Sequence, residues 1–328
     1  ASDVYKRQNL CIELITREGV ALVIDNLSFT LNAGETLSFV GESGCGKSMT
    51  ALALMGLLPE KVGRVASGSI IFNDENLAQA SNDRMRAIRG NDISMIFQEP
   101  MTSLNPVFTI GEQIAEVLRA HQALSRKAAW SQAIELLDAV RIPNAKGRVS
   151  DYPFQMSGGQ RQRAMIAMAL ACRPKILIAD EPTTALDVTV QAQIFDLLSD
   201  LRQQTGTAII LITHDMGAVA EMAERMIVMY AGRKAELGPV DQIIDRPRHP
   251  YTKGLIECVP HIQDDPSSER HNLVEVPGIV PSLREFGKDQ CLFASRCPYV
   301  TETCLKSRPV AKQFKNDQSA DCWHAEAL

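Results

Sequence analysis

The spacing of hydrophobic residues first indicates a parallel β-sheet. The runs TLSFV (36–40), ILIAD (176–180) and TAIILIT (207–213) are short and almost continuously apolar, as strands buried on both faces are. Between the last two, the segment 188–206 carries an apolar stripe with helical spacing and ends in a glycine. Alternation of strands and helices in this order predicts an α/β fold with a parallel core sheet.

Other segments predict two additional parts. Residues 9–35 alternate between apolar and polar like antiparallel strands, and GSIIFN (68–73) continues this pattern. Residues 110–121 and 125–141 have helical spacing, and the serine that opens the second segment is a suitable N-cap. We therefore expect an antiparallel β-subdomain, and a helical subdomain over about residues 100–173.

The pattern changes near residue 236, where prolines cluster and periodicity fades. We place a domain boundary there, between a main domain over 9–235 and a small irregular C-terminal domain over 236–328. Residues 1–8 fit neither pattern, and they lack the apolar stretch of a secretory signal.

Composition and charge narrow the class of protein. Of 328 residues, 45% are hydrophobic, and the net charge is −5. This charge gives no basic field for nucleic acid, so we expect no nucleic-acid partner. No run approaches the ~18 apolar residues of a membrane-spanning helix. Eight cysteines without a secretion signal favour a reducing cytosol.

A phosphate-binding loop follows the first of the buried strands. The segment GESGCGKS (41–48) matches G-x-x-x-x-G-K-[ST] between a strand and a helix, which is the context the motif requires. Its backbone N–H groups and the helix N-terminus would hold the phosphates of a nucleotide. Lys47 would reach the β- and γ-phosphates, and the Ser48 hydroxyl would bind Mg²⁺. The expected ATP-binding residues in this segment are Gly41, Ser43, Gly44, Cys45, Gly46, Lys47, Ser48 and Met49.

An acidic pair ends the strand ILIAD. Asp180 is suited to hold Mg²⁺, and Glu181 is suited to orient and polarise an attacking water. Such a pair alone often only caps a loop, but its position after a phosphate loop makes it a candidate catalytic site. We also predict that Lys47 and the helix N-terminus lower the pKa of the Cys45 thiol, so that nucleotide would protect it from alkylation.

With the segment MSGGQRQR (156–163), the chain resembles the ATP-binding cassette (ABC) ATPases over about 9–235. The family's motifs occur in its order: the phosphate loop, Gln98 in MIFQEP, SGGQ, ILIADEP, TALD (184–187) and His214 in ITHD. The resemblance implies the P-loop NTPase cassette fold, with ATP and Mg²⁺ as cofactors. It implies that Gln98 and His214 contact the nucleotide site and take part in catalysis with Glu181 and Lys47. Mg²⁺ would be held by Ser48, Gln98 and Asp180.

The resemblance also implies a dimer. Ser157, Gly158, Gly159 and Gln160 begin a helix whose amides would bind the γ-phosphate held by a second cassette, and Asp187 would lie at the dimer seam. The family usually places an aromatic ring near the end of the first strand to stack on adenine. This chain has Leu14 and Ile15 in that stretch.

Segments of the C-terminal domain (236–328) indicate which branch of the ABC ATPases the chain resembles. The short spacing between Gln98 and Ser157 leaves no room for the coiled coil of chromosome and repair ATPases. The segments RPRHPYTKGLIECVP (246–260) and VPGIVPSLREFGKDQCLFASRCPY (276–299) resemble the dipeptide/oligopeptide importer ATPases. This implies a second homologous ATPase subunit, two transmembrane permease subunits and an extracytoplasmic solute-binding protein. It also implies a peripheral location on the cytoplasmic face of the bacterial inner membrane. The alternatives are a soluble ABC ATPase that clamps another macromolecule, and an iron–sulfur redox protein with a vestigial cassette.

Four cysteines in the tail form a candidate metal site: Cys291, Cys297, Cys304 and Cys322. They lack the tight C-x₂₋₄-C pair of structural zinc sites, whereas iron–sulfur ligation uses four thiolates at varied spacings. Some importer ATPases of this type hold a 4Fe–4S cluster on the same pattern. We expect a 4Fe–4S cluster, with zinc, a disulfide or unligated thiols as alternatives. Cys11, Cys172 and Cys258 are expected to be ordinary core residues.

Overall fold

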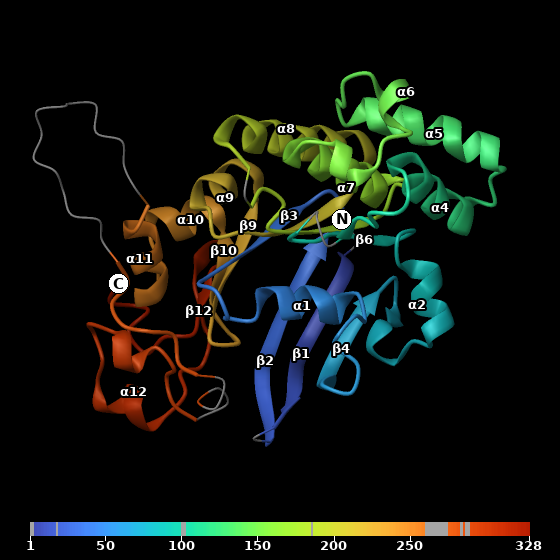
Figure 1. The fold of residues 1–328 in the computed structure, drawn as a ribbon. Coiled ribbons are helices and arrows are strands. Elements are labelled where there is room, and N and C mark those ends of the chain that lie inside the picture. Colours follow the sequence, from blue (N-terminus) through green and yellow to red (C-terminus); the bar gives the residue numbers. More distant parts are fainter. Residues whose placement is uncertain are drawn as a thin grey trace, which may run out of the picture.

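An eight-stranded sheet forms the core of the molecule (Figure 1). The computed structural model describes residues 3–17, 19–99, 103–184, 186–259, 275–282, 285 and 289–328. The strand order is β11-β12-β10-β9-β3-β8-β7-β6. Five strands are parallel: β3 (Thr36–Val40), β6 (Ile93–Ile96), β7 (Ile176–Asp180), β8 (Ala208–Ile212) and β9 (Arg225–Tyr230). Antiparallel strands β10 (Arg233–Pro239), β12 (Ser319–Ala320) and β11 (Lys312–Gln313) extend one edge.

The apolar runs form strands because both faces of this sheet are covered. In β7, Leu177 and Ala179 pack into the core cluster on the helical side. Ile176 and Ile178 pack into the cluster on the opposite side, together with residues of the antiparallel sheet. Continuous hydrophobicity is therefore required, as predicted for parallel strands between two layers.

A second, four-stranded antiparallel sheet has the order β2-β1-β4-β5. Its strands are β1 (Asp3–Thr16), β2 (Gly19–Asn32), β4 (Gly63–Phe72) and β5 (Glu75–Asn76). Residues 3–8, which fitted no sequence pattern, form the first half of β1 and pair with β2 and β4.

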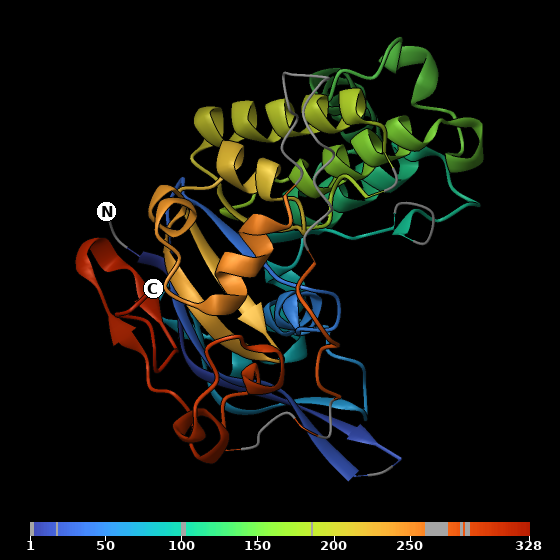
Figure 2. The ribbon, with the colours of Figure 1, turned by 90° about the vertical axis from the view of Figure 1, so that its left-hand side faces the viewer.

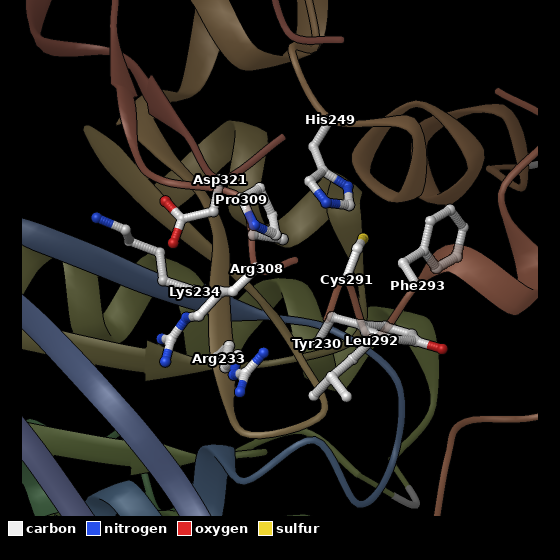
Figure 3. Close-up of a pocket in the computed structure, with 11 residues that line it drawn as sticks. Tyr230, Arg233, Lys234, His249, Cys291, Leu292, Phe293, Arg308, Pro309 and Asp321 are labelled. Carbon is white, nitrogen blue, oxygen red and sulfur yellow. The ribbon is translucent and has the colours of Figure 1, made fainter. Parts of the chain in front are cut away.

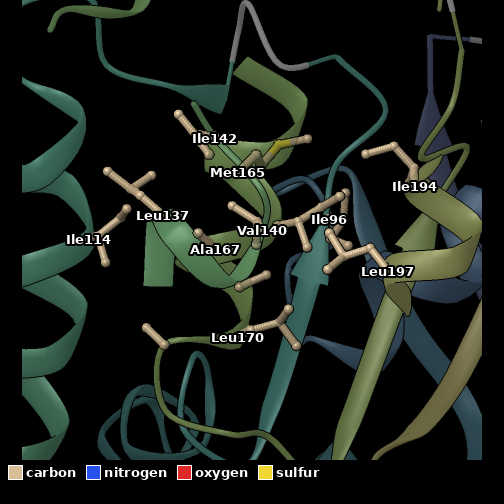
Figure 4. Close-up of a cluster of buried hydrophobic side chains, with 14 of the residues drawn as sticks. Ile96, Ile114, Leu137, Val140, Ile142, Met165, Ala167, Leu170, Ile194 and Leu197 are labelled. Atoms are coloured by element: carbon tan, nitrogen blue, oxygen red, sulfur yellow. The ribbon is translucent and has the colours of Figure 1, made fainter. Parts of the chain in front are cut away.

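The helical subdomain contains α4 (Ile110–Gln122), α5 (Arg126–Ala139), α6 (Ala145–Arg148) and α7 (Gly158–Leu170). The Ser125 hydroxyl caps α5 as predicted, and Thr109 with Glu112 forms a capping box on α4. Figure 4 shows how Ile114, Leu137 and Met165 from these helices meet the side chains of the core sheet and α8. The subdomain therefore shares its core with the sheet that carries the acidic pair.

The remaining helices lie around the core sheet, except for α12, which lies in the C-terminal segment (Figure 1). They are α1 (Lys47–Leu54), α2 (Asn82–Ile88), α8 (Val188–Thr205), α9 (Met216–Met222), α10 (Val240–Asp245), α11 (Pro250–Glu257) and α12 (Glu302–Lys306). Helix α1 ends at Leu54, and the backbone turns left-handed two residues later at Gly56 (φ 60°). Within the described ranges, no helix combines the length and apolarity needed to cross a bilayer.

The C-terminal segment joins the core sheet instead of forming a separate layer. Strand β12 pairs with β10, and Figure 2 shows this red segment beside the orange strands. The side chain of Glu236 on β10 is fully buried and accepts hydrogen bonds from the Arg248 and His249 backbone and from Gln318. The sheet is thus continuous across the boundary expected near residue 236.

Candidate functional site

The phosphate loop lies between β3 and α1, as the motif predicts. A Cβ atom on Gly41 would lie 2.3 Å from the Met229 carbonyl oxygen, and one on Gly46 would lie 2.4 Å from Ile24. Both glycines have positive φ, so close packing and backbone conformation each require glycine here. Ser43 and Gly44 form the exposed tip of the loop.

Lys47 is folded back under the loop. Its side chain is buried, and its Nζ atom donates to the Gly41 carbonyl at 2.6 Å and to the Glu42 carbonyl at 3.0 Å. These neutral acceptors leave the positive charge without a carboxylate partner among the described contacts. An anion that enters the loop would therefore meet a cation whose hydrogen-bond acceptors are neutral carbonyl groups.

Ser48 and Asp180 meet at the ends of their elements. The Ser48 hydroxyl donates to Asp180 Oδ1 at 3.1 Å. Burial raises the pKa of Asp180, as does the nearby charge of Glu181, while the bond from Ser48 and the charge of Lys47 oppose this rise. A hydroxyl and a carboxylate at this separation are oxygen ligands of the kind that Mg²⁺ prefers.

Glu181 is held by three side chains. Its Oε2 atom accepts hydrogen bonds from Gln98 Nε2 at 2.9 Å and from Thr184 Oγ1 at 2.8 Å. Its Oε1 atom lies 3.6 Å from Nδ1 of the exposed His214. Burial raises the pKa of Glu181, but the Thr184 bond, the His214 charge and the Gln98 bond together hold it below the ordinary value. The carboxylate is thus kept ionised and fixed in position.

The structure thus brings together five predicted residues: Lys47, Ser48, Gln98, Asp180 and Glu181, with His214 at the rim. Thr184 contacts the site, but the sequence analysis gave it no separate role. The sequence offered one indication of this role, because Thr184 lies three residues after Glu181 in the turn that follows the strand with the acidic pair.

The SGGQ segment forms the N-terminus of α7. Ser157 caps the helix and forms a capping box with Gln160. Gly158 is exposed, and a Cβ atom there would meet nothing within 4 Å. In the described part of the chain, no hydrogen bond joins residues 157–160 to the phosphate loop of the same molecule. Asp187 is exposed and caps α8 through the Val190 N–H.

The prediction of a low pKa for Cys45 is wrong. Its side chain is only 1% exposed, and burial raises the pKa of the thiol above its ordinary value despite the opposing charge of Lys47. The prediction that three other cysteines are core residues is also wrong, because each is half-buried: Cys11, Cys172 and Cys258. At the end of β1, Leu14 is half-buried and Ile15 is exposed.

The four tail cysteines lie within electrostatic reach of one another. Burial raises the pKa of Cys291 and of Cys322 to about 11; the charges of Cys297 and Cys304 add to both shifts, and that of Cys291 adds to the shift of Cys322. Figure 3 shows Cys291 beside His249 and Phe293 in a small cavity. The Sγ atom of Cys304 lies 3.6 Å from Nε2 of His324. Across the described residues, no group of three or more His, Cys, Asp or Glu side chains is arranged so that it could hold a metal ion.

Two family models match the chain. The model described as "ABC transporter" matches residues 24–184. The model described as "Oligopeptide/dipeptide transporter, C-terminal region" matches residues 235–304. The first match contains the phosphate loop, the SGGQ segment and the acidic pair, and the second contains three of the four tail cysteines.

Similar proteins agree with both matches. A probable peptide ABC transporter ATP-binding protein of Sinorhizobium fredii is 50% identical over 311 residues, covering 95% of this chain and 92% of that protein. The oligopeptide transport ATP-binding protein OppD of Haemophilus influenzae is 50% identical over 316 residues, covering 96% and 95%. Among solved structures, the dimeric bacterial ABC transporter cassette MJ0796 has a TM-score of 0.65 and 28% identity, covering 72% of this chain and 98% of that one. A second structure of that cassette is a post-hydrolysis dimer bound to ADP and Pi, with the same score. The chain therefore belongs to the ABC transporter ATPases, in the branch that carries the oligopeptide/dipeptide transporter C-terminal region.

Proposed function

We propose that this chain is the ATP-hydrolysing subunit of an importer for dipeptides, oligopeptides or peptide-like solutes. One observation carries the proposal: Ser48, Asp180, Glu181 and Gln98 converge beside the phosphate loop in a chain whose tail matches the oligopeptide/dipeptide transporter region. The two named relatives, which match nearly the whole chain, are peptide and oligopeptide transport ATP-binding proteins. The cytoplasmic face of the inner membrane is the location at which such a subunit would meet ATP and permeases.

The loop and Lys47 supply the phosphate site. Loop amides and the N-terminus of α1 face the phosphates, and Lys47 leaves its carbonyl acceptors for the β- and γ-phosphate oxygens. Ser48, Asp180 and Gln98 would hold Mg²⁺, which offsets negative charge on the nucleotide. The three residues offer only oxygen donors, so they fit a hard cation.

Glu181 acts as the base for the attacking water. Its carboxylate is ionised at neutral pH because three neighbouring side chains favour the charged form. Gln98 and Thr184 share one oxygen, so the other oxygen remains available to accept a proton from water. His214 stands 3.6 Å from that second oxygen, where it reaches the γ-phosphate side of the site. A general base of this kind contributes ~10²–10⁴ in rate.

A second cassette completes each site. Ser157 and Gly158 lie at an exposed helix N-terminus, and among the described residues no hydrogen bond joins it to the phosphate loop of its own molecule. An exposed N-terminus attracts an anion, and in our proposal that anion is the γ-phosphate held by the partner ATPase. Asp187 lies at the seam. The dimeric MJ0796 cassette is the structural precedent for such an arrangement.

The helical subdomain is the proposed contact with the permease subunits. A hollow of about 500 Å³ lies on this subdomain and is lined by Phe108, Glu116, Arg119, Arg126 and Trp130, among others. Val107 and Phe108 beside it are 70% and 48% exposed. Helix α4 begins two residues later and packs into the core shared with β6, the strand after which Gln98 lies. Movement at Gln98 would therefore reach the hollow.

A 4Fe–4S cluster on Cys291, Cys297, Cys304 and Cys322 is the proposed ligand of the tail. The four thiols influence one another electrostatically, and four thiolates are the donor set that such a cluster uses. When bound, the cluster would cross-link the C-terminal segment, which has only a small hydrophobic core of its own, and so stabilise it. Visible absorption and iron analysis of anaerobically purified protein would test this.

The main experiment is Glu181→Gln. This variant keeps the hydrogen-bonding shape but removes the base, so we expect hydrolysis to fall by at least ~10²-fold while ATP binding persists. ATP should then hold the ATPase subunits as a dimer, visible by size-exclusion chromatography. Unchanged turnover would reject the role of Glu181. To separate an importer from a soluble ABC ATPase, tagged protein would be purified from its native membrane fraction. Recovery without permease subunits would contradict the importer.

A further inference from the structure

The four-cysteine region makes direct contact with the phosphate loop. Arg296 lies at the end of a short 3₁₀ helix (Ala294–Arg296) between Cys291 and Cys297. Its guanidinium donates a bidentate pair of hydrogen bonds to the Glu42 carboxylate: Nη1 to Oε2 at 2.7 Å, and Nη2 to Oε1 at 3.0 Å. Glu42 is the second residue of the loop, so the contact joins residues 254 positions apart.

The surroundings of Arg296 hold this cation in one position. Its side chain is 3% exposed, whereas that of Glu42 is 30% exposed. The Nε and Nη2 atoms donate to the backbone carbonyls of Pro277 and Val276 at 2.6 and 3.0 Å. The guanidinium also lies over the ring of Tyr230. Since every contact but the Glu42 carboxylate is neutral, the buried charge depends on Glu42 for its compensation.

Tyr251 forms a second link to the same residue. The Glu42 N–H donates to the hydroxyl of the fully buried Tyr251 at 2.8 Å. The ring of Tyr251 packs edge-on against Tyr230, with centroids 4.7 Å apart. The Glu42 carbonyl accepts from Lys47 Nζ. Side chain and backbone of Glu42 are therefore held by the C-terminal segment on one side and by the phosphate-binding lysine on the other.

We propose that Arg296 is a positioning residue for the phosphate loop. It fixes Glu42 and, through it, the carbonyl that holds Lys47, so that ATP affinity depends on the order of the segment that carries the four cysteines. Cys297 follows Arg296 directly, so a change at this thiol reaches the loop through Arg296. The inference rests on the proposed role of residues 41–48 as the ATP phosphate site.

The full-length protein with Arg296→Gln tests this inference. We expect ATP to bind about tenfold more weakly, measured with a fluorescent ATP analogue, which equals ~1.4 kcal/mol. Arg296→Lys keeps the positive charge but cannot form the bidentate pair of hydrogen bonds, so its ATP affinity should lie between those of Arg296→Gln and the wild type. The loss should appear as a rise in KM that exceeds any fall in kcat, because the altered loop holds ATP before reaction.

Arg308→Gln is the matched control. Arg308 also ties the C-terminal segment to the cassette, through Asp25 at 2.9 Å, but it does not contact the phosphate loop. Both variants should lower the unfolding temperature, and only Arg296→Gln should weaken ATP binding. If Arg308→Gln weakened binding equally, Arg296 would be a general anchor and the proposal would be wrong.

Two further comparisons locate the effect. Since Arg296 acts through Glu42, the double variant E42Q/R296Q should bind ATP no more weakly than the weaker single variant, and additive losses would overturn the proposal. Cys297→Ser should weaken ATP binding in the wild-type background and not in the Glu42→Gln background. Lys47→Ala separates the two hypotheses. Full ATP affinity in Lys47→Ala would reject the phosphate site itself, whereas a loss there with normal affinity in Arg296→Gln would reject only the role of Arg296.

Discussion

Thr184→Val should slow ATP hydrolysis without weakening ATP binding. The substitution keeps the size of the side chain but removes the hydroxyl that donates to Glu181 Oε2 at 2.8 Å. A hydrogen bond to a charged group contributes ~1.5–3 kcal/mol. The lower end of this range applies to the loss of the Thr184 hydroxyl, because Gln98 still donates a hydrogen bond to the same Glu181 oxygen. A cost of ~1.5 kcal/mol in the transition state corresponds to roughly a tenfold fall in kcat.

The pH profile gives an independent readout of the same change. The base works only when Glu181 is ionised, so activity is lost as the pH falls through its pKa. The Thr184 bond is one of the contacts that lower this pKa; without it the pKa rises, and the acidic limb of the kcat profile moves to higher pH. Steady-state ATPase rates across the acidic range measure both effects.

The control is Thr184→Ser, which keeps the hydroxyl and should keep kcat and the acidic limb near those of the wild type. If Thr184→Val left both kcat and the acidic limb unchanged, the hydrogen bond would have no part in positioning Glu181. A rise in KM at constant kcat would place Thr184 in ATP binding instead, and would equally refute the reasoning.

Two more predictions follow from buried groups. Cys45 should react with a maleimide more slowly than the half-buried Cys11, with or without ATP, because burial covers the thiol and raises its pKa; mass spectrometry of labelled peptides measures both rates, and faster labelling of Cys45 would contradict its burial. Burial lowers the pKa of His249 from 6.5 to about 4. Below pH 6.5 the unfolded state therefore binds a proton that the folded state does not, and stability should fall by up to ~3 kcal/mol as the pH approaches 4. Thermal melts of His249→Asn, which keeps a capping side chain, should show less of this loss; an identical pH dependence would exclude His249 as its source.

The sequence predicted those features that depend on neighbours close in the chain. The strands β3, β7 and β8 were expected from apolar runs, and the caps of α5 and α8 from Ser125 and Gly206. The helical stripe of α8 was equally local. In each case a periodic pattern or a single capping residue carries the information, so no knowledge of the three-dimensional fold was needed.

The features that the sequence missed depend on contacts between distant segments. Lys47 beside Cys45 suggested a low pKa, but the thiol is buried within the core cluster of the antiparallel sheet, and desolvation outweighs the neighbouring charge. Likewise, nothing near Glu42 in the chain indicates its pairing with Arg296. Strand β12 has only two residues, which is too short for any alternating pattern to appear.

The pairing of β12 with β10 limits how this protein can have evolved. The chain's final strand satisfies backbone groups of a strand that belongs to the ATPase core, and Gln318 next to it helps to solvate the buried Glu236. A tail that lacked this strand and Gln318, if joined near residue 236 by recombination, would leave the β10 edge unpaired and the Glu236 carboxylate without this donor. The C-terminal segment and the ATPase core should therefore have been inherited together, and phylogenetic trees of the two parts should have the same branching order.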